Sequence, residues 1–586
     1  MELDIIIVTY NSEFWVEKCV DSISRCRFPK EKLNLIFVDN ASSDSTVTKI
    51  EQEIVNNESS FGSMQLIQNK KNVGFGRANN IGAKKGKSDY IFFLNIDTEV
   101  FEDSIQNASI VIEQSDKNIA AWEFRQFPYE HPKNYDPVTL STSWITGAAF
   151  IIRRAVFAEV NGFDKAIFMY AEDVDLSWRI RSKGYKLIYM PQCIVYHYSY
   201  NEENEIKPNQ FTHSLINNLN LKVRYGSLRH VVTWHLKFSY MLLQGNPNHG
   251  LRRNLVSAYI QNLSMIPFFY SRSLKKLRPT FVGWDYEEER TGGFYNNFVQ
   301  HDYKPLVSIL IRTIGRTKIL KEALTSVRNQ TYKNIEVIVV EDGGNESEKL
   351  IKEDFHDLNI VFFSIKDKVG RSRAANIALD MANGEFLNFL DDDDLLFPDH
   401  VEVLVNELSR HPISVIYSVA FEVPTEYLPD ESTQNHEYKV VFNSKFNRLK
   451  LFYQNYLPIQ CVMFKKDLVR DKIYFDENMD ALEDWDFWMR LSLDNDFLLV
   501  DKTTSLYRVP YHKTQVENRQ KVLDNAIAYV REKQKNYFSN MNGYDVSMNI
   551  MDLIEHSQTS SLKNRHKILY SLYKILLKMI KTLKKI

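Results

Sequence analysis

The chain has 586 residues, of which 44% are hydrophobic and 25% are charged, and its 73 Lys and Arg against 75 Asp and Glu leave a net charge of −2. This composition is typical of globular protein with two to four domains; it excludes extensive disorder and any general polyanion-binding surface, so we expect no nucleic-acid partner. The four cysteines form neither a C-x-x-C pair nor a dense secreted pattern, which favours buried, reduced thiols in a cytosolic compartment.

The N-terminal residues, 3–8, read as a strand, without the basic and hydrophobic segments of a signal peptide. The nearest approach to a membrane span, the apolar run 238–243, is too short to cross a bilayer, so we expect a soluble or peripheral protein. From the first strand onward, short Val, Ile, Leu and Phe runs alternate with segments of helical period. This alternation predicts an α/β fold built of βαβ units around a mainly parallel sheet.

The same pattern occurs twice along the chain. The strand end Leu94-Asn95-Ile96-Asp97 lies 296 positions before Leu390-Asp391-Asp392-Asp393, and the same offset relates Gly74, Arg77, Asn80 and Ile81 to Gly370, Arg373, Asn376 and Ile377. Further on, Glu-Asp-Val-Asp at 172–175 is matched by Glu-Asp-Trp-Asp at 483–486. Matched blocks in one order indicate internal repetition, so we predict two copies of one α/β domain, at residues 1–200 and 305–520.

Residues 201–304 and 521–586 lie outside the two copies. The first of these segments is rich in helix formers and aromatics and predicts a helical extension followed by a linker. The second ends in residues 561–586, which contain seven Lys, one Arg and no acid, with an apolar stripe at helical spacing. An amphipathic cationic helix of this kind suits the surface of an anionic membrane, although docking on the protein itself or on a partner helix would produce the same pattern.

Acidic residues follow a buried strand in each copy. In a parallel sheet, ligands bind beyond the carboxyl ends of the strands, where these acids are expected. Carboxylates spaced as in Asp391-x-Asp393 suit a hard divalent cation shared with substrate phosphates. A helix cap or a solvated loop is the alternative for such an acidic run, but it does not account for the repetition.

Taken together, the motifs resemble glycosyltransferase family 2. They are Val-Asp-Asn-Ala-Ser-Ser-Asp at 38–44, Asn-Val-Gly-Phe-Gly-Arg-Ala-Asn-Asn at 72–80, the acidic strand end, and Glu-Asp-x-Asp-x-x-x-Arg. The first copy is most similar to bacterial rhamnosyltransferases. The resemblance implies two Rossmann-like domains of the GT-A type, inverting transfer from a UDP- or dTDP-sugar, and a Mg²⁺ or Mn²⁺ ion.

The resemblance also implies roles for individual residues. The expected nucleotide-sugar contacts are Thr9, Asp39, Arg77, Asn80 and Asn95 in the first copy, and Thr313, Asp342, Arg373, Asn376 and Asp391 in the second. Asp39 and Asp342 would meet the edge of the base, and Arg77 and Arg373 the phosphates. The expected metal ligands are Asp97, His197, Asp393 and His512, although a histidine in a Tyr-rich strand is commonly structural. Because Asn95 replaces a carboxylate, the first metal site is expected to be the weaker one.

Inverting transfer needs a base on the acceptor side, and the resemblance assigns it to Asp173 and Asp484, with Glu172 and Glu483 orienting the acceptor. Acids at a helix start are also favoured by the helix dipole alone. Our hypothesis is a cytoplasmic, bifunctional hexosyl- or deoxyhexosyltransferase, peripheral on the inner face of the membrane, that extends a lipid-linked bacterial polysaccharide of the O-antigen or capsule type. The alternatives are one catalytic domain, the second, beside a degenerate acceptor-positioning copy, and a non-enzymatic glycan-binding scaffold.

Overall fold

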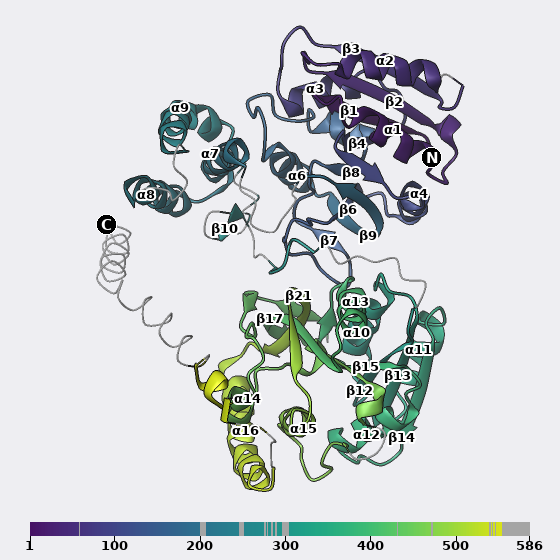
Figure 1. Ribbon diagram of the computed structural model, residues 1–586, viewed down its shortest axis with the longest axis vertical. Helices are drawn as coiled ribbons and strands as arrows, with labels where there is room; N and C mark the ends of the chain where they lie inside the picture. The colour runs from purple at the N-terminus through teal and green to yellow at the C-terminus, as the bar shows by residue number, and fades with distance from the viewer. Residues whose placement is uncertain are drawn as a thin grey trace. The chain divides into compact units, whose positions relative to one another are not determined.

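The computed structural model describes residues 1–537 except 58, 200–206, 245–250, 431, 470–472 and parts of 275–303, together with some positions between 541 and 553 (Figure 1). It divides into two compact units, the first made mainly of residues 1–301 and the second mainly of residues from 302 onward.

The first unit is built on a nine-stranded sheet in the order β3-β2-β1-β4-β8-β6-β9-β5, with β7 paired to β9. Its strands are β1 (Leu3–Thr9), β2 (Leu33–Asp39), β3 (Ser63–Gln68), β4 (Tyr90–Asn95), β5 (Thr98–Val100), β6 (Ile119–Phe127), β7 (Ser141–Thr142), β8 (Ala149–Arg153) and β9 (Lys186–His197). Its helices are α1 (Val16–Ser24), α2 (Thr46–Asn56), α3 (Phe75–Ala83), α4 (Ser104–Gln114), α5 (Arg154–Glu159) and α6 (Glu172–Ser182). The four strands β3, β2, β1 and β4 are parallel, whereas β8 and β5 pair antiparallel with their neighbours, so the sheet is mixed.

Both faces of this sheet are buried, which explains its nearly continuous apolar strands. Along β1, Leu3, Ile5 and Ile7 pack into a core with Val16 and Val20 of α1. On the opposite face, Ile6 packs with Ala78 of α3. Alternate residues of one strand thus serve two cores.

A helical segment follows the first sheet: α7 (Pro208–Tyr225), α8 (Leu228–Gln244) and α9 (Leu251–Ser271), then the short pair β10 (Phe281–Val282) and β11 (Asp285–Tyr286). Helix α7 packs on α6 through Leu221 and Tyr225, which share a core with Trp144, Val174 and Trp178. The expected helical extension is therefore attached to the first domain beside its Glu-Asp motif.

The second unit repeats the first sheet. Its order is β14-β13-β12-β15-β20-β17-β21-β16, with β18 and β19 paired to β17. The strands are β12 (Val307–Thr313), β13 (Ile335–Asp342), β14 (Ile360–Ile365), β15 (Phe386–Asp391), β16 (Leu395–Leu396), β17 (Val415–Tyr427), β18 (Thr433–Asn435), β19 (Lys439–Val440), β20 (Val462–Lys465) and β21 (Phe497–Pro510). The helices are α10 (Thr317–Arg328), α11 (Ser347–Asp354), α12 (Arg371–Met381), α13 (His400–Arg410), α14 (Arg448–Tyr453), α15 (Glu483–Leu491) and α16 (Lys513–Gln534). The identical strand order confirms the duplication, and both units are α/β domains.

Further expectations concern the cysteines, the end of the second domain and the membrane. All four cysteines are buried and unpaired. Helix α16 runs across the domain boundary expected at residue 520. The cationic segment 561–586 lies outside the described residues. In the part of the chain that is described, no helix is both long enough and apolar enough to span a bilayer.

Candidate active site

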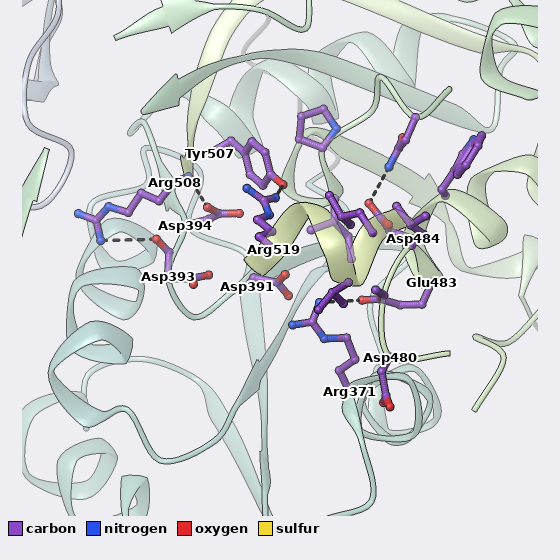
Figure 2. Close-up of a pocket in the computed structure, with 18 of the residues that line it drawn as sticks. Arg371, Asp391, Asp393, Asp394, Asp480, Glu483, Asp484, Tyr507, Arg508 and Arg519 are labelled. Carbon is purple, nitrogen blue, oxygen red and sulfur yellow. Dashed lines mark hydrogen bonds and ion pairs between the residues drawn. The ribbon is translucent and has the colours of Figure 1, made fainter. Parts of the chain in front are cut away.

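The acidic strand end of the second domain opens onto a large cavity. A space of about 800 Å³ is lined by Asp391, Asp393 and Asp394 at the end of β15, and by Glu483 and Asp484 at the start of α15 (Figure 2). A second space of about 430 Å³ adjoins it and is lined by Thr313, Asp342, Lys368 and Gly370. The two spaces share Asp391, Asp393 and Arg371, so they form one cleft with two compartments.

Arginines neutralise most of this acidic run. Arg312 donates from Nε and Nη2 to Oδ1 of Asp391, at 3.1 and 2.5 Å. Arg316 pairs with Asp392 and lies 3.2 Å from Asp393. The backbone N–H of Arg508 donates to Asp394 at 2.8 Å, and its side chain reaches the Asp393 carbonyl (Figure 2). Arginine side chains thus pair with Asp391, Asp392 and Asp393, whereas burial and the charges of Asp393 and Asp391 raise the pKa of Asp394.

The first domain has neutral residues where the second has the Asp391–Arg312 ion pair. Val8 is the strand neighbour of Asn95, whereas Arg312 is the strand neighbour of Asp391. The additional carboxylate of the second domain is therefore matched by an additional arginine. Asp391 is engaged by Arg312 in the structure, and the relative strength of the two metal sites stays a prediction.

Asn95, Asp97 and His197 come together in the first domain, as the sequence predicts. His197 Nε2 lies 3.4 Å from both Asp97 Oδ1 and Asn95 Nδ2, and its Nδ1 lies 2.8 Å from Gln126 Oε1. Burial alone would raise the pKa of Asp97, but the hydrogen bond and charge of His197 lower it. The Asn95 Oδ1 atom is buried and has no hydrogen-bond partner. One carboxylate, one imidazole and one free amide oxygen suit Mn²⁺ or Mg²⁺.

The second domain has different candidate metal ligands. His512 is half exposed and lies 3.1 Å from Glu426, and it is not among the residues that line the cleft. Asp393 lines both compartments and has a partly exposed side chain. Among the described residues, no group of three or more His, Cys, Asp or Glu side chains is arranged so that it could hold a metal ion. The geometry therefore supports a metal ligand at Asp393 and leaves His512 without a structural argument for that role.

The two Glu-Asp pairs occupy equivalent, strained helix starts. Helix α6 follows Ala171 at φ +67°, and α15 follows Leu482 at φ +59°. Left-handed backbone at such residues costs about 1–3 kcal/mol and is typical of functional sites. In each pair the first acid, Glu172 or Glu483, is buried, and the second is partly exposed. The repeated turn thus presents one acid of each pair to the surface.

The second, partly exposed acid of each pair accepts a hydrogen bond from another segment of its domain. Asp173 Oδ2 accepts from the Gly147 N–H at 2.7 Å, and Asp484 Oδ2 accepts from Asn455 Nδ2 at 2.9 Å. Burial and the charge of Glu483 raise the pKa of Asp484 to about 7. Burial and the charge of Asp173 raise the pKa of Glu172 to about 8, and burial also raises the pKa of Asp173. A carboxylate with a pKa near neutrality is suited to act as a general base.

The third acid of each motif, Asp175 or Asp486, is structural. Asp175 accepts from Arg179 at 2.7 Å and is paired with Arg224 of α7. Asp486 accepts from Arg490 and from Lys533 of α16, each at 3.0 Å. In both domains, a helix that follows the sheet is anchored on the helix that carries the Glu-Asp pair.

The expected nucleotide contacts divide into two groups. Thr9 donates to Asp39 at 3.0 Å, and Thr313 and Asp342 line the smaller compartment. Asn80 and Asn376 instead bind the backbone of Phe163 and Phe475, at 2.9 and 3.0 Å. Arg77 donates to the carbonyl of Lys165. Arg373 lies 3.4 Å from Glu477 and lines neither compartment, whereas Arg371, two residues earlier, lines both.

The structure changes which residue of the second copy is equivalent to Asp39. Strand pairing places Thr9 beside Asp39 but Thr313 beside Glu341. Asn40 accepts from the Val73 N–H, as Asp342 accepts from the Val369 N–H. Asp342 is therefore equivalent to Asn40, and Glu341 to Asp39.

Sequence reasoning missed several residues of the cleft. They are Arg312, Arg316, Lys368, Arg371, Asn455, Tyr507 and Arg519. Arg312 could have been found, because it is the one charged residue of its strand and its first-copy counterpart is Val8. Arg371 could also have been found, because it lies between the repeated Gly370 and Arg373, where the first copy has Phe75. The others carry no motif.

The raised pKa of Asp484 predicts a pH-dependent second activity. A protonated acid cannot accept a proton, so the rate should rise with pH through about 7. The charges of Glu483 and Asp391 raise this pKa and the Asn455 hydrogen bond lowers it, so Asn455→Ala should move the midpoint upward. Initial rates between about pH 5.5 and 9 measure both effects; a flat profile would contradict this role for Asp484.

The sequence of this chain is similar to those of known glycosyltransferases. The family model described as glycosyl transferase family 2 matches residues 4–174 and 308–473. An uncharacterized glycosyltransferase of Methanocaldococcus jannaschii is 28% identical over 246 residues, which are 40% of this chain and 83% of the relative. The GalNAc(5)-diNAcBac-PP-undecaprenol beta-1,3-glucosyltransferase of Campylobacter jejuni is 26% identical over 208 residues, which are 35% of this chain and 65% of that protein.

Among solved structures, the mannosyltransferase PcManGT of Pyrobaculum calidifontis in complex with GDP-Man and Mn²⁺ is 16% identical, with a TM-score of 0.34 over 46% of this chain and 83% of that chain. The family assignment rests on the family model, whose two matched regions cover more than half of the 586 residues. The chain therefore belongs to glycosyltransferase family 2, has a GT-A domain in each half, and is a glycosyltransferase.

Proposed function

We propose that both halves are catalytic and that the chain is a bifunctional inverting glycosyltransferase. Each half would transfer a hexosyl or deoxyhexosyl group from a UDP- or dTDP-sugar to a growing bacterial polysaccharide. The observation that supports this proposal best is the repeated strained helix start, which leaves Asp173 and Asp484 accessible in the same way. A scaffold that only bound glycans would have no need for two such bases.

The cleft of the second domain is suited to two substrates. The smaller compartment, with Thr313, Asp342 and Lys368, would hold the nucleotide, and Arg371 would face its diphosphate. The larger one is lined by Tyr427, Tyr453, Trp485 and Tyr507, aromatic surfaces on which sugar rings can pack. Asp484 would take the proton from an acceptor hydroxyl, whose oxygen attacks C1 of the donor sugar from the face opposite the departing diphosphate. That attack inverts the configuration at C1.

The metal implied by the family would neutralise charge that develops on the diphosphate as the glycosidic bond breaks. Asp97, His197 and the free amide oxygen of Asn95 would hold it in the first domain, and Asp393 would do so in the second.

The function can be tested with the full-length chain and a panel of nucleotide sugars. Purified protein should transfer two different sugars, or one sugar in two linkages, to a lipid-diphosphate-linked oligosaccharide in the presence of Mn²⁺. The name of the Campylobacter relative contains an undecaprenol-linked diphosphate, which supports this choice of acceptor. Transfer of a single sugar in a single linkage under all conditions would favour one catalytic domain.

The cationic segment 561–586 remains a sequence-based prediction. A peripheral location on the inner face of the membrane would bring the enzyme to a lipid-linked acceptor. Deletion of these residues should weaken co-sedimentation with anionic vesicles, because seven Lys and one Arg are lost together with an apolar stripe. Transfer to a short soluble acceptor should change little; an unfolded truncated protein would instead indicate an internal docking role.

A further inference from the structure

The helical segment after the first sheet has an unusual charge pattern. Residues 206–284 contain eleven Lys and Arg and no Asp or Glu, although the whole chain has a net charge of −2. These 79 residues include α7, α8 and α9. Their cationic character is therefore local and is offset by acids elsewhere in the chain.

Helix α7 is the inner helix of this segment. Arg224 pairs with Asp164 and Asp175 of the first domain, and Asn217 donates to the carbonyls of Met169 and Tyr170, both at 2.9 Å. Its other side packs against α8 and α9. Leu215 and Leu219 of α7 form a core with Trp234 and Phe238 of α8 and Leu255 of α9.

Helices α8 and α9 each have a second apolar face that no described residue covers. On α8, Leu228, Val232 and Leu236 follow at intervals of four and are 78%, 39% and 48% exposed. On α9, the exposed apolar side chains have helical spacing as well: Val256, Ile260, Leu263 and Tyr270. The α9 stripe extends about 21 Å at 1.5 Å per residue. Soluble helices normally bury their apolar face, so two open stripes indicate an interaction surface.

Cations border these stripes. Arg229 and Lys237 are exposed and directly follow Leu228 and Leu236, and Arg272 is exposed beyond the end of α9. The occupant must therefore be both apolar and anionic. The tail of this chain at 561–586 is itself cationic, and a second copy would bring two acid-free surfaces together, so charge disfavours both.

We propose that the outer faces of α8 and α9 form a docking surface for an anionic lipid bilayer. The exposed Leu, Val, Ile and Tyr side chains would enter the interfacial region, while the flanking Lys and Arg contact lipid phosphates. Because α7 fixes this segment beside α6, the surface would hold the first domain's Asp173 at a constant distance from the membrane. This attachment is independent of segment 561–586 and of the proposed reaction.

The test uses the full chain and a truncated chain that ends at residue 560. Each is compared with its triple variant, which carries Leu228→Glu, Leu236→Glu and Ile260→Glu. Vesicles of phosphatidylcholine with about 30% phosphatidylglycerol are sedimented with the protein. The truncated protein should still bind, and the triple variant of it should bind at least tenfold more weakly. Pure phosphatidylcholine vesicles and high salt should also reduce binding. Val55→Glu with Ile110→Glu, exposed apolar positions on α2 and α4, is the matched control and should bind like the parent.

A fluorescence measurement covers the case in which the triple variant does not fold. An environment-sensitive dye on Ile260→Cys should shift to the blue when anionic vesicles are added, and the same dye on Val55→Cys should not. Loss of all binding on truncation at 560, equal binding by a folded triple variant, or an unchanged dye spectrum would each overturn the proposal. So would a dimer that the triple substitution abolishes without any vesicle binding, because the surface would then belong to a second copy.

Discussion

Asp484→Asn should abolish the second transfer and leave the first intact, and Asp173→Asn should do the reverse. Each loss should be about 10²- to 10⁴-fold in kcat, since an amide cannot take the acceptor's proton. Asparagine keeps the shape of the side chain and can still accept the hydrogen bonds from Asn455 and Gly147. Rates for each donor, measured separately with a full-length protein, distinguish the two activities.

Exposed acids outside the two sites serve as controls. Asp494→Asn, just beyond α15, and Asp116→Asn, beyond α4, should leave both rates unchanged. If one of the two base variants retained full activity with every donor and acceptor, its half would not use the proposed base. If either variant abolished both activities, the chain would have a single reaction to which both domains contribute.

The second prediction concerns the metal ligand His197. His197→Ala should weaken the Mn²⁺ response of the first activity at least about tenfold, since the imidazole lies 3.4 Å from Asp97. His512→Ala is the matched control and should leave the second activity unchanged, because His512 lies against Glu426 and not in the cleft. Mn²⁺ titrations followed by rate and by calorimetry measure both variants.

Carboxylate variants extend this comparison. Asp97→Ala and Asp393→Ala should each remove the metal response of their own half only. An excess of chelator that left both activities at their full rate would rule out a metal-assisted leaving group in either domain. If His197→Ala and His512→Ala weakened the Mn²⁺ response of their own halves equally, His512 would be a metal ligand.

The sequence alone determined the duplication, the α/β fold, the family and the residues at the strand ends. These follow from local and periodic signals: apolar strands, helical spacing, and motifs whose order is the same in both copies. The Glu-Asp pairs repeat in both copies, and the family resemblance implied that Asn95, Asp97 and His197 belong to one site; the structure brings these three together. The nucleotide contacts stay a prediction; in the structure the repeated Asn80 and Asn376 bind backbone carbonyls, of Phe163 and Phe475.

Tertiary structure decided how the charges are paired and which repeated residues are equivalent. Only strand pairing shows that Arg312 lies beside Asp391 and that Glu341, not Asp342, corresponds to Asp39. Only helix packing shows that Asp175 and Asp486 anchor Arg224 and Lys533, which are 49 and 47 residues away. Such pairings join segments that are distant in the chain, and no local pattern encodes them. The motifs therefore identified the reaction class of this protein. The pairing of charges around its sites depends on contacts that form only when the chain folds.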